Sequence, residues 1–298
     1  MNCELTKGRF APSPTGRMHL GNVFSALLSW LSIKSQGGEW LLRIEDIDPQ
    51  RSKQHYADQI MCDLEWLGLT WDEGPYYQSE RSDIYEEHLS ILRNKGLLYP
   101  SYKTRAERLA VSAPQEGDSP PAPLLKRGER NVLGALTLRV SDCMIEYVDR
   151  HYGTQTVDIK NDIGDFIVRR RDGAWAYQLA VVVDDALMGI TEVVRGRDLL
   201  QSAGQQIYLG ELFGFPRMEY AHLPLLCNEA GQRLSKRDKS MDLGQLQQRF
   251  SAEEIIGTLA FFAHLIDKNE PCRPQYLLPL FDWNKVPLAD IKVEIEKS

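Results

Sequence analysis

Two segments of the chain carry residues whose types and spacing suit phosphate chemistry. The first is the string Arg9-Phe10-Ala11-Pro12-Ser13-Pro14-Thr15-Gly16-Arg17-Met18-His19-Leu20-Gly21-Asn22. It predicts a strand, a proline-stiffened turn and a helix whose first turn holds a histidine and a glycine. Backbone N–H groups and the dipole at a helix N-terminus attract phosphate, and Gly21 lets a base or a phosphate approach the backbone. A proline-rich turn that merely caps a helix is the alternative, and the complete string favours the phosphate site.

The second segment is a basic run late in the chain. Four of the seven residues from Arg233 to Lys239 are basic, namely Arg233, Lys236, Arg237 and Lys239. A basic loop can close on a triphosphate and neutralise the charge that builds up in a transition state. Taken alone, the run is equally consistent with a solvated basic loop.

Strand and helix patterns alternate over the first hundred residues, and these elements must position the first segment. Apolar residues recur at helical spacing over residues 19–35, and residues 40–44 form a compact apolar strand. Ser52 is expected to cap a helix that runs to residue 67. Further expected elements are strands at 8–11 and 97–99 and a helix at 82–94. This alternation predicts a parallel sheet with helices on both faces.

The alternation breaks after Pro100. Residues 112–123 are rich in Pro, Ser and Gly and predict a loop, and residues 133–160 predict short strands. Helix and strand patterns resume near residue 177, and prolines punctuate short helices over residues 242–298. We expect an insertion between two halves of one α/β domain.

Composition narrows the class of protein. Apolar residues make up 43% and charged residues 26% of the chain, which excludes a fully disordered protein. The five cysteines are scattered, and we expect reduced thiols in a cytoplasmic protein. The N-terminus lacks the apolar core of a signal peptide, and no apolar run is long enough for a membrane helix. With a net charge of −7, any nucleic acid must be bound by local basic patches, such as Arg169-Arg170-Arg171 and the basic run.

The two phosphate segments resemble the two signature sequences of class I aminoacyl-tRNA synthetases, one after the first strand and one late in a nucleotide-binding fold. His19 and Lys236 are 217 positions apart here. The string RFAPSPTGRMHLGN, followed by LLRIEDID and WLGLTWDEGPYYQSER, resembles the glutamyl branch of this family. The resemblance covers residues 8–100 and 165–245 closely and the tail more loosely. It implies an α/β fold with a Rossmann-type parallel sheet, an inserted subdomain and a short C-terminal helical region.

The same resemblance implies the domain organisation. Residues 1–100 and 166–241 would be the two halves of the nucleotide-binding catalytic domain, the second of which carries the basic signature loop. Residues 101–165 would be the inserted acceptor-type subdomain, and residues 242–298 a short helical region.

The resemblance also implies a set of site residues. The catalytic residues would be His19 and Lys236. ATP would be bound by His19, Gly21, Asn22, Ser235 and Lys236. Glutamate would be bound by Arg9, Ala11, Ser13, Glu45, Tyr177 and Arg195.

The chemistry of glutamate agrees with this pocket. Arg9 and Arg195 can each bind a carboxylate, and Glu45, at the end of a strand, can bind the ammonium group. Alternatives are that Glu45 and Arg195 belong to salt bridges within the sheet and that Tyr177 packs in the core.

The end of the chain at residue 298 favours one group within the glutamyl branch. A glutamyl-tRNA synthetase resembling this chain would need a further domain to read the anticodon, which we do not expect here. The ending Asp282-Trp283-Asn284-Lys285-Val286-Pro287 is similar to that of paralogues without this domain. By resemblance to that group, the partners would be L-glutamate, ATP with Mg²⁺, and tRNA(Asp) whose anticodon carries queuosine.

One departure from the family concerns zinc. Many relatives carry a Cys-x-Cys pair after a Tyr-Pro, but Tyr99-Pro100 is followed here by Ser101-Tyr102-Lys103. Because a structural zinc site needs about four ligands at close range, we expect no structural zinc.

Three other functions stay open. The chain could be a minimal glutamyl-tRNA synthetase that charges the 3′ end of tRNA(Glu). It could also be a non-catalytic RNA-binding protein, although such a protein has no use for both phosphate segments. A nucleotidyltransferase acting on a small molecule shares the fold, but the glutamate pocket speaks against it.

Overall fold

The computed structural model describes residues 5–102, 134–228, 230–234 and 242–293, so the expected loop at 112–123 lies outside the described residues. The strands are β1 (Lys7–Phe10), β2 (Glu39–Ile44), β3 (Glu73–Tyr77), β4 (Leu98–Ser101), β5 (Ala135–Leu138), β6 (Met144–Asp149), β7 (Gly153–Asp158), β8 (Phe166–Arg169), β9 (Glu192–Gly196), β10 (Glu219–Leu223), β11 (Leu226–Cys227) and β12 (Ile291–Lys292). The helices are α1 (Leu20–Lys34), α2 (Gln54–Trp66), α3 (Ser82–Asn94), α5 (Tyr177–Leu187), α6 (Leu200–Phe213), α7 (Leu243–Leu246), α8 (Ala252–Phe262) and α9 (Pro274–Leu277). None of the helices in these ranges is both long and apolar enough to cross a membrane.

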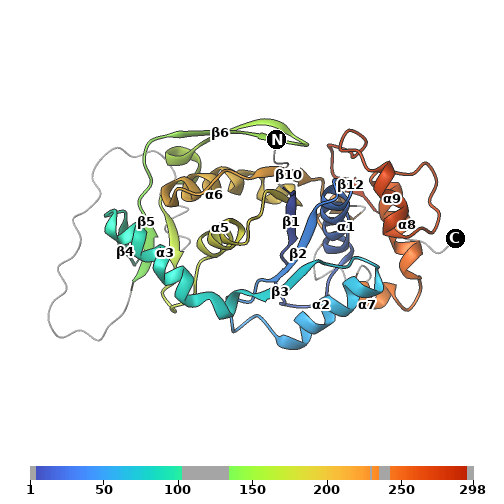
Figure 1. The fold of residues 1–298 in the computed structure, drawn as a ribbon, viewed down its shortest axis with the longest axis horizontal. Coiled ribbons are helices and arrows are strands. Elements are labelled where there is room, and N and C mark those ends of the chain that lie inside the picture. The colour runs from blue at the N-terminus through green and yellow to red at the C-terminus, as the bar shows by residue number, and fades with distance from the viewer. Residues whose placement is uncertain (1–4, 103–133, 229, 235–241, 294–298) are drawn as a thin grey trace.

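The centre of the molecule is a sheet with the strand order β3-β2-β1-β9-β10-β6-β7. Every neighbouring pair from β3 to β6 is parallel, and only β6 and β7 pair antiparallel. The α/β fold with a mostly parallel sheet is therefore confirmed. In Figure 1 this sheet lies between two end regions, with β4 and β5 at one end and α8 and α9 at the other.

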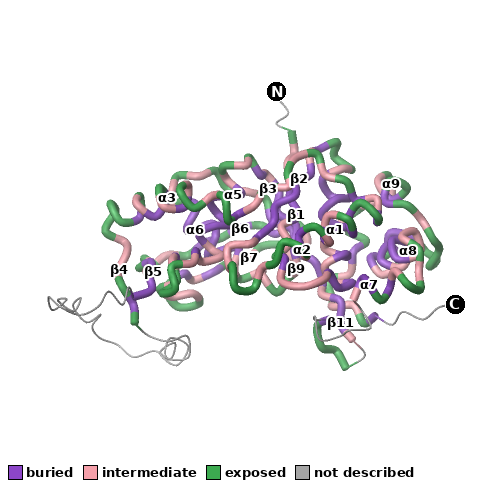
Figure 2. The backbone as a smooth tube through the Cα atoms, turned by 90° about the horizontal axis from the view of Figure 1, so that it is seen from below, coloured by how far each residue is buried: buried purple, intermediate pink, exposed green. Residues whose placement is uncertain are grey.

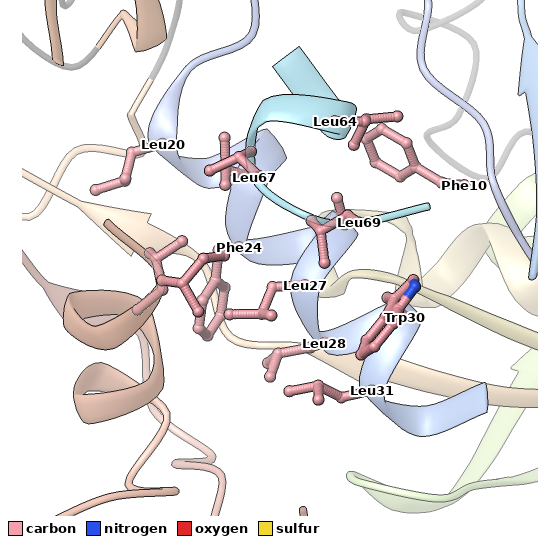
Figure 3. Close-up of a cluster of buried hydrophobic side chains, with 14 of the residues drawn as sticks. Phe10, Leu20, Phe24, Leu27, Leu28, Trp30, Leu31, Leu64, Leu67 and Leu69 are labelled. Atoms are coloured by element: carbon pink, nitrogen blue, oxygen red, sulfur yellow. The ribbon is translucent and has the colours of Figure 1, made fainter. Parts of the chain in front are cut away.

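Helix α1 covers one face of the sheet and is buried on most of its surface, because its sequence is almost entirely apolar or small. Its apolar side chains pack against the end of α2 and against α8 in one continuous core. Figure 3 shows part of this core, and its labelled side chains are Phe10, Leu20, Phe24, Leu27, Leu28, Trp30, Leu31, Leu64, Leu67 and Leu69.

Helices α3, α5 and α6 form a second core on the other side of the sheet. Tyr85 and Leu89 of α3, Leu179 and Val183 of α5 and Leu209 of α6 are fully buried there. In Figure 2 buried residues run along the middle of the molecule, while the outer surface of α3 is largely exposed. The parallel sheet is thus enclosed by helices on both faces, as its apolar central strands require.

Several expected elements differ from the structure. The strand expected at 97–99 is β4, but it pairs antiparallel with β5 in a separate sheet of order β4-β5-β8 rather than with the central sheet. The segment expected to be an insertion also contributes β6 and β7, which extend the central sheet beyond β10. Strand β3 was not expected, because its residues are polar or proline-rich and it lies half-exposed at the sheet edge.

The expected cap of α2 is wrong. The helix begins one residue later than Ser52 predicts, with Lys53 as its N-cap and no capping side chain. The backbone N–H of Lys53 donates to the carbonyl of Pro14 at 3.0 Å, which ties the start of α2 to the proline turn. A local capping rule does not include such a contact between segments that are distant in the sequence.

Candidate active site

His19 is the N-cap of α1, one position before the helical turn in which the sequence predicts it. Its Nδ1 accepts a hydrogen bond from the backbone N–H of Gly21 at 3.1 Å, and its own backbone N–H donates to Asn22 Oδ1 at 3.1 Å. Because Nδ1 is an acceptor, a neutral His19 ring carries its proton on Nε2, where it can donate to a phosphate oxygen. The N–H groups of Gly21, Asn22 and Val23 already donate to His19 itself. The His19 ring and the dipole of α1 are therefore what this helix end can offer a phosphate.

The proline turn that precedes His19 is fixed against the end of β2. The backbone N–H of Glu45 donates to the carbonyl of Pro12 at 3.0 Å, and the N–H of Thr15 donates to the carbonyl of Ser13 at 2.8 Å. Ala11 is half-buried and Ser13 is exposed. The turn thus brings these predicted pocket residues close to Glu45, at the carboxyl ends of β1 and β2.

A buried ionic cluster lies beneath this turn. Arg9 Nε and Arg43 Nη1 both donate to Asp185 Oδ1, at 3.0 and 2.6 Å, and Arg43 Nη2 donates to Glu45 Oε1 at 3.3 Å. Burial acts to raise the pKa of Asp185, but the charges of Arg43 and Arg9 outweigh it and hold that pKa low. Burial raises the pKa of Glu45 above its ordinary value despite both arginines. The cluster holds Arg9 and Glu45 in place at the end of the sheet.

The hydroxyl of Tyr177 is influenced by the charges of both this cluster and Arg195. It is the first residue of α5 and is partly buried. Burial raises the pKa of its hydroxyl, and the negative charge of Glu45 adds to the increase, while Arg195 and Arg9 oppose it. The charges of Glu45, Arg195 and Arg9 therefore all act on the Tyr177 hydroxyl.

Arg195 lies on β9 and is held by three neutral acceptors. Its Nε donates to His222 Nε2 at 3.1 Å, Nη1 to Gln206 Oε1 at 2.7 Å, and Nη2 to the carbonyl of Leu199 at 3.3 Å. No carboxylate of the described residues forms a salt bridge with it. The alternative of a salt bridge within the sheet therefore does not describe Arg195 in this structure, whereas Glu45 does pair with Arg43.

Ser235 and Lys236 lie outside the described residues, but both flanks of the basic run are described. Leu234 N–H donates to the carbonyl of Leu226 on β11 at 2.9 Å. On the other side, Asp242 forms a β-bridge with His19, and Leu243 N–H donates to the carbonyl of Met18 at 3.0 Å. The described residues on either side of 235–241 therefore lie beside β11 and beside the first phosphate segment.

Several residues around the site were missed by sequence reasoning. They share burial and a direct contact with a predicted residue or its partner, and they are Arg43, Asp149, Asp185, Gln206 and His222. Two of these residues, Arg43 and Asp185, could have been predicted from the sequence, because each is a charged residue within or next to an apolar run. Arg43 interrupts the apolar strand β2, and Asp185 follows the apolar run of α5.

Metal binding is not evident among the described residues. No three His, Cys, Asp or Glu side chains in those ranges lie close enough together to hold a metal ion. Of the two positions where many relatives carry cysteine, Ser101 is the last residue of β4 and Lys103 lies outside the described residues.

Comparisons with known proteins find a family match over most of the chain and relatives that match nearly all of it. The family described as tRNA synthetases class I (E and Q), catalytic domain, matches residues 6–250. The chain is 42% identical over 311 residues to the Glutamyl-Q tRNA(Asp) synthetase of Symbiobacterium thermophilum, with 97% of this chain and 96% of the relative covered. It is 40% identical to the protein of the same name from Nitratidesulfovibrio vulgaris, with 99% of each chain covered.

Among solved structures, the chain is similar to a glutamate tRNA ligase from Elizabethkingia meningosepticum that was crystallised in complex with its amino acid. The TM-score is 0.78 at 30% sequence identity. The match covers 97% of this chain and 67% of the ligase.

Proposed function

We propose a function from one premise: the chain belongs to the family of class I tRNA synthetases (E and Q). It activates glutamate with ATP in the cytoplasm and transfers the glutamyl group to queuosine in the anticodon of tRNA(Asp). The observation that supports the activation step is the ionic cluster that holds Arg9 and Glu45 at the ends of β1 and β2, together with the β-bridge between Asp242 and His19. The acceptor is supported by the relatives named Glutamyl-Q tRNA(Asp) synthetase, which the chain matches over 96% and 99% of their lengths.

Glutamate has two carboxylates and one ammonium group, and the pocket complements all three. Arg9 and Arg195 bind carboxylates, Glu45 binds the ammonium group, and Tyr177 offers a hydroxyl beside them. Ala11 and Ser13 border this pocket from the turn. The carboxylate of Asp185 accepts hydrogen bonds from both Arg9 and Arg43. It therefore orients Arg9 but neutralises its positive charge only in part.

In the activation step an oxygen of the glutamate α-carboxylate attacks the α-phosphorus of ATP. The new carboxyl–phosphorus bond forms as the bond to pyrophosphate breaks, and pyrophosphate leaves with the electron pair. His19 donates from Nε2 to the phosphate, and Lys236 neutralises charge that develops on the departing oxygens. Gly21, Asn22 and Ser235 border the nucleotide. Mg²⁺ bound to the ATP phosphates would share the charge neutralisation, and it needs few protein ligands for that role.

In the transfer step a ring hydroxyl of queuosine attacks the carbonyl carbon of the glutamyl adenylate. An ester bond forms, AMP leaves with the electron pair of the broken bond, and the hydroxyl proton is released. Charging of tRNA(Glu) at its 3′ end is the rival reaction. It has less support, because the chain corresponds to 67% of the similar glutamate tRNA ligase but to nearly the whole of the Glutamyl-Q tRNA(Asp) synthetases.

The test has two stages. ATP–pyrophosphate exchange is measured with each amino acid in the absence of tRNA, and we expect exchange with glutamate. Labelled glutamate is then offered with three acceptors, namely tRNA(Asp) with queuosine, the same tRNA without queuosine, and tRNA(Glu). We expect labelling only of the first. Exchange with glutamine or aspartate but not glutamate contradicts the activation step, and labelling of tRNA(Glu) at its 3′ end supports the rival reaction.

A further inference from the structure

The guanidinium group of Arg195 is held in place without being neutralised. Its three recorded partners are a histidine nitrogen, an amide oxygen and a backbone carbonyl, none of which is charged in the arrangement observed. Three of its five N–H groups are used by these partners, which leaves one on each Nη for a carboxylate. Arg9, by comparison, donates to the carboxylate of Asp185.

His222 can accept from Arg195 only in one tautomer. The residue is fully buried on β10, next to Arg195 in the register of β9 and β10. Because Nε2 accepts the hydrogen bond from Arg195, the ring proton must be on Nδ1, where it is donated to Asp149 Oδ2 at 2.6 Å. Asp149 therefore selects the tautomer that Arg195 requires.

Asp149 is itself fixed by the backbone. Its Oδ1 accepts from the N–H groups of His151 at 3.0 Å and Tyr152 at 2.9 Å, at the corner between β6 and β7. Asp149 also forms the bridge that joins β6 to Tyr220 of β10, and the Tyr220 ring lies 5.4 Å from the guanidinium carbon of Arg195. The β6–β7 hairpin thus reaches the predicted pocket through Asp149, His222 and Arg195.

We propose that His222, with its tautomer set by Asp149, is a positioning residue that orients Arg195 toward a carboxylate of the amino-acid substrate. This inference rests on the proposed function, because it takes glutamate as the ligand of Arg195. Its consequence is specific: loss of the His222 acceptor weakens glutamate binding through Arg195, while ATP binding and the chemical step are affected much less.

Two substitutions at His222 separate the two hydrogen bonds of the ring. In His222→Gln the amide oxygen can reach the position of Nε2 and accept from Arg195. In His222→Asn the shorter side chain can retain the bond to Asp149 but not the one to Arg195. We expect His222→Asn to raise the KM for glutamate by about 10-fold, the size typical of losing a hydrogen bond to a charged group, with kcat changed far less. His222→Gln should restore most of the affinity.

Asp149→Asn tests the tautomer separately. The backbone N–H groups of His151 and Tyr152 require an acceptor at the position of Oδ1, so the NH₂ group of the new amide side chain would face His222 Nδ1. The ring proton would then move to Nε2, which could no longer accept from Arg195. We expect this nearly isosteric change to raise the KM for glutamate as His222→Asn does, with the KM for ATP unchanged.

The deciding experiment repeats His222→Asn in the Arg195→Ala background, with exchange kinetics and thermal unfolding measured for all four proteins. A positioning role predicts that His222→Asn adds no further increase in the KM for glutamate once Arg195 is absent. An equal increase in both backgrounds, or an unchanged KM in His222→Asn alone, overturns the positioning role. If wild-type protein supports no glutamate-dependent exchange, the proposed function fails and this inference fails with it.

Discussion

Burial of Glu45 gives its proposed role, binding the ammonium group of glutamate, a pH dependence that can be measured. Its carboxyl group lies beside Arg43, yet burial dominates and raises its pKa above the ordinary value of 4.5. As the pH falls, Glu45 therefore takes up its proton at a higher pH than an exposed glutamate does, and a protonated Glu45 cannot pair with the glutamate ammonium group. We expect kcat/KM for glutamate to fall on the acidic side with a midpoint above pH 4.5.

The matched variant is Glu45→Gln, which should show low kcat/KM at every pH and lack this acidic decline. The contribution of Glu45 to the stability of the fold should depend on pH in the opposite sense to kcat/KM: it is larger at low pH. A carboxyl group with a raised pKa in the folded state stabilises the fold below its unfolded pKa and loses that contribution as the pH rises. Glu45→Gln should therefore raise the melting temperature at pH 7 more than at pH 5. An acidic decline that persists in Glu45→Gln would assign the titration to another group.

Lys236 and Lys239 belong to the same basic run but are expected to differ in role. Removal of one preorganised donor to a transition-state oxygen typically costs about 3 kcal/mol, or about 100-fold in rate. We expect Lys236→Ala to lower the rate of ATP–pyrophosphate exchange by about that factor, with Lys239→Ala as the control for a general loss of positive charge. Similar rates for both variants would show that the run acts only through its summed charge.

The pocket residues were predicted from the family resemblance, and the residues that hold them were not predicted. Arg9, Glu45 and His19 stand in strings that resemble those of the glutamyl branch, and this resemblance implies their roles. Asp149 and His222 are far apart in the sequence and meet only because β6 joins the sheet beside β10. A contact that depends on strand order is not visible in local spacing, although Asp185 and Arg43 could have been suspected from charges inside apolar runs.

At the scale of elements, the start of α1 shows how one helix end serves both folding and chemistry. Gly21 is the second residue of the helix, and a Cβ atom there would lie 3.0 Å from His19 Cε1 and 3.1 Å from Nδ1. Alanine favours helix over glycine by up to about 1 kcal/mol, so Gly21→Ala should not weaken the fold. It should displace the His19 ring and lower the exchange rate by about 10-fold or more.

Gly210 in α6 provides the control. A Cβ atom there would meet nothing closer than Val182 Cγ1 at 3.8 Å, so Gly210→Ala should raise stability and leave exchange unchanged. Unfolding in urea and exchange kinetics on both variants check the pair. Normal exchange by Gly21→Ala would mean that the His19 ring position is not critical.

Apolar periodicity predicted the helices well and the strand partners poorly. The residues of α1 and α3 were predicted almost to their ends, because both have a clear helical repeat and glycines beyond them. The pairing of β4 with β5 and of β6 with β10 depends on long connections, and β3 is half-exposed with few apolar residues. The order of the strands in the sheets therefore could not be predicted from the sequence alone.

At the scale of the whole molecule, the C-terminal helices share one core with α1. Leu259 of α8 is fully buried in the cluster that contains Leu27 and Leu31. Loss of a buried leucine side chain costs about 2–5 kcal/mol, so Leu259→Ala should lower the free energy of unfolding by about 3 kcal/mol in a single transition. Phe261 on the same helix is 37% exposed, and its replacement by alanine should cost less. Two separate unfolding transitions would show that α8 is an independent unit.

The charge of the whole molecule restricts how it can bind RNA. With a net charge of −7, the chain must bind RNA through local groups of cations. Three arginines lie at the end of β8 and just after it, and they differ in the partners that they contact. Arg169 pairs with Glu86 and lies over the Trp175 ring at 4.4 Å, which makes it part of the packing. Arg170 pairs with Asp48 and Asp172, whereas Arg171 donates to the backbone carbonyl of Tyr102. The positive charge of Arg171 is therefore less neutralised than that of Arg169 or Arg170, which makes Arg171 the better candidate for a phosphate contact.

This difference predicts the salt dependence of tRNA binding. Each phosphate contact contributes about 0.7–0.9 to the slope of log K against log salt, so binding should weaken steeply with added salt. Arg171→Ala should reduce that slope by about 0.7–0.9, while Arg170→Ala should change it less because two carboxylates already neutralise that side chain. Filter binding of queuosine-containing tRNA(Asp) over a range of salt concentrations measures both slopes. An unchanged slope in Arg171→Ala would mean that RNA contacts lie elsewhere, and the remaining candidates would be the basic residues between Arg233 and Lys239.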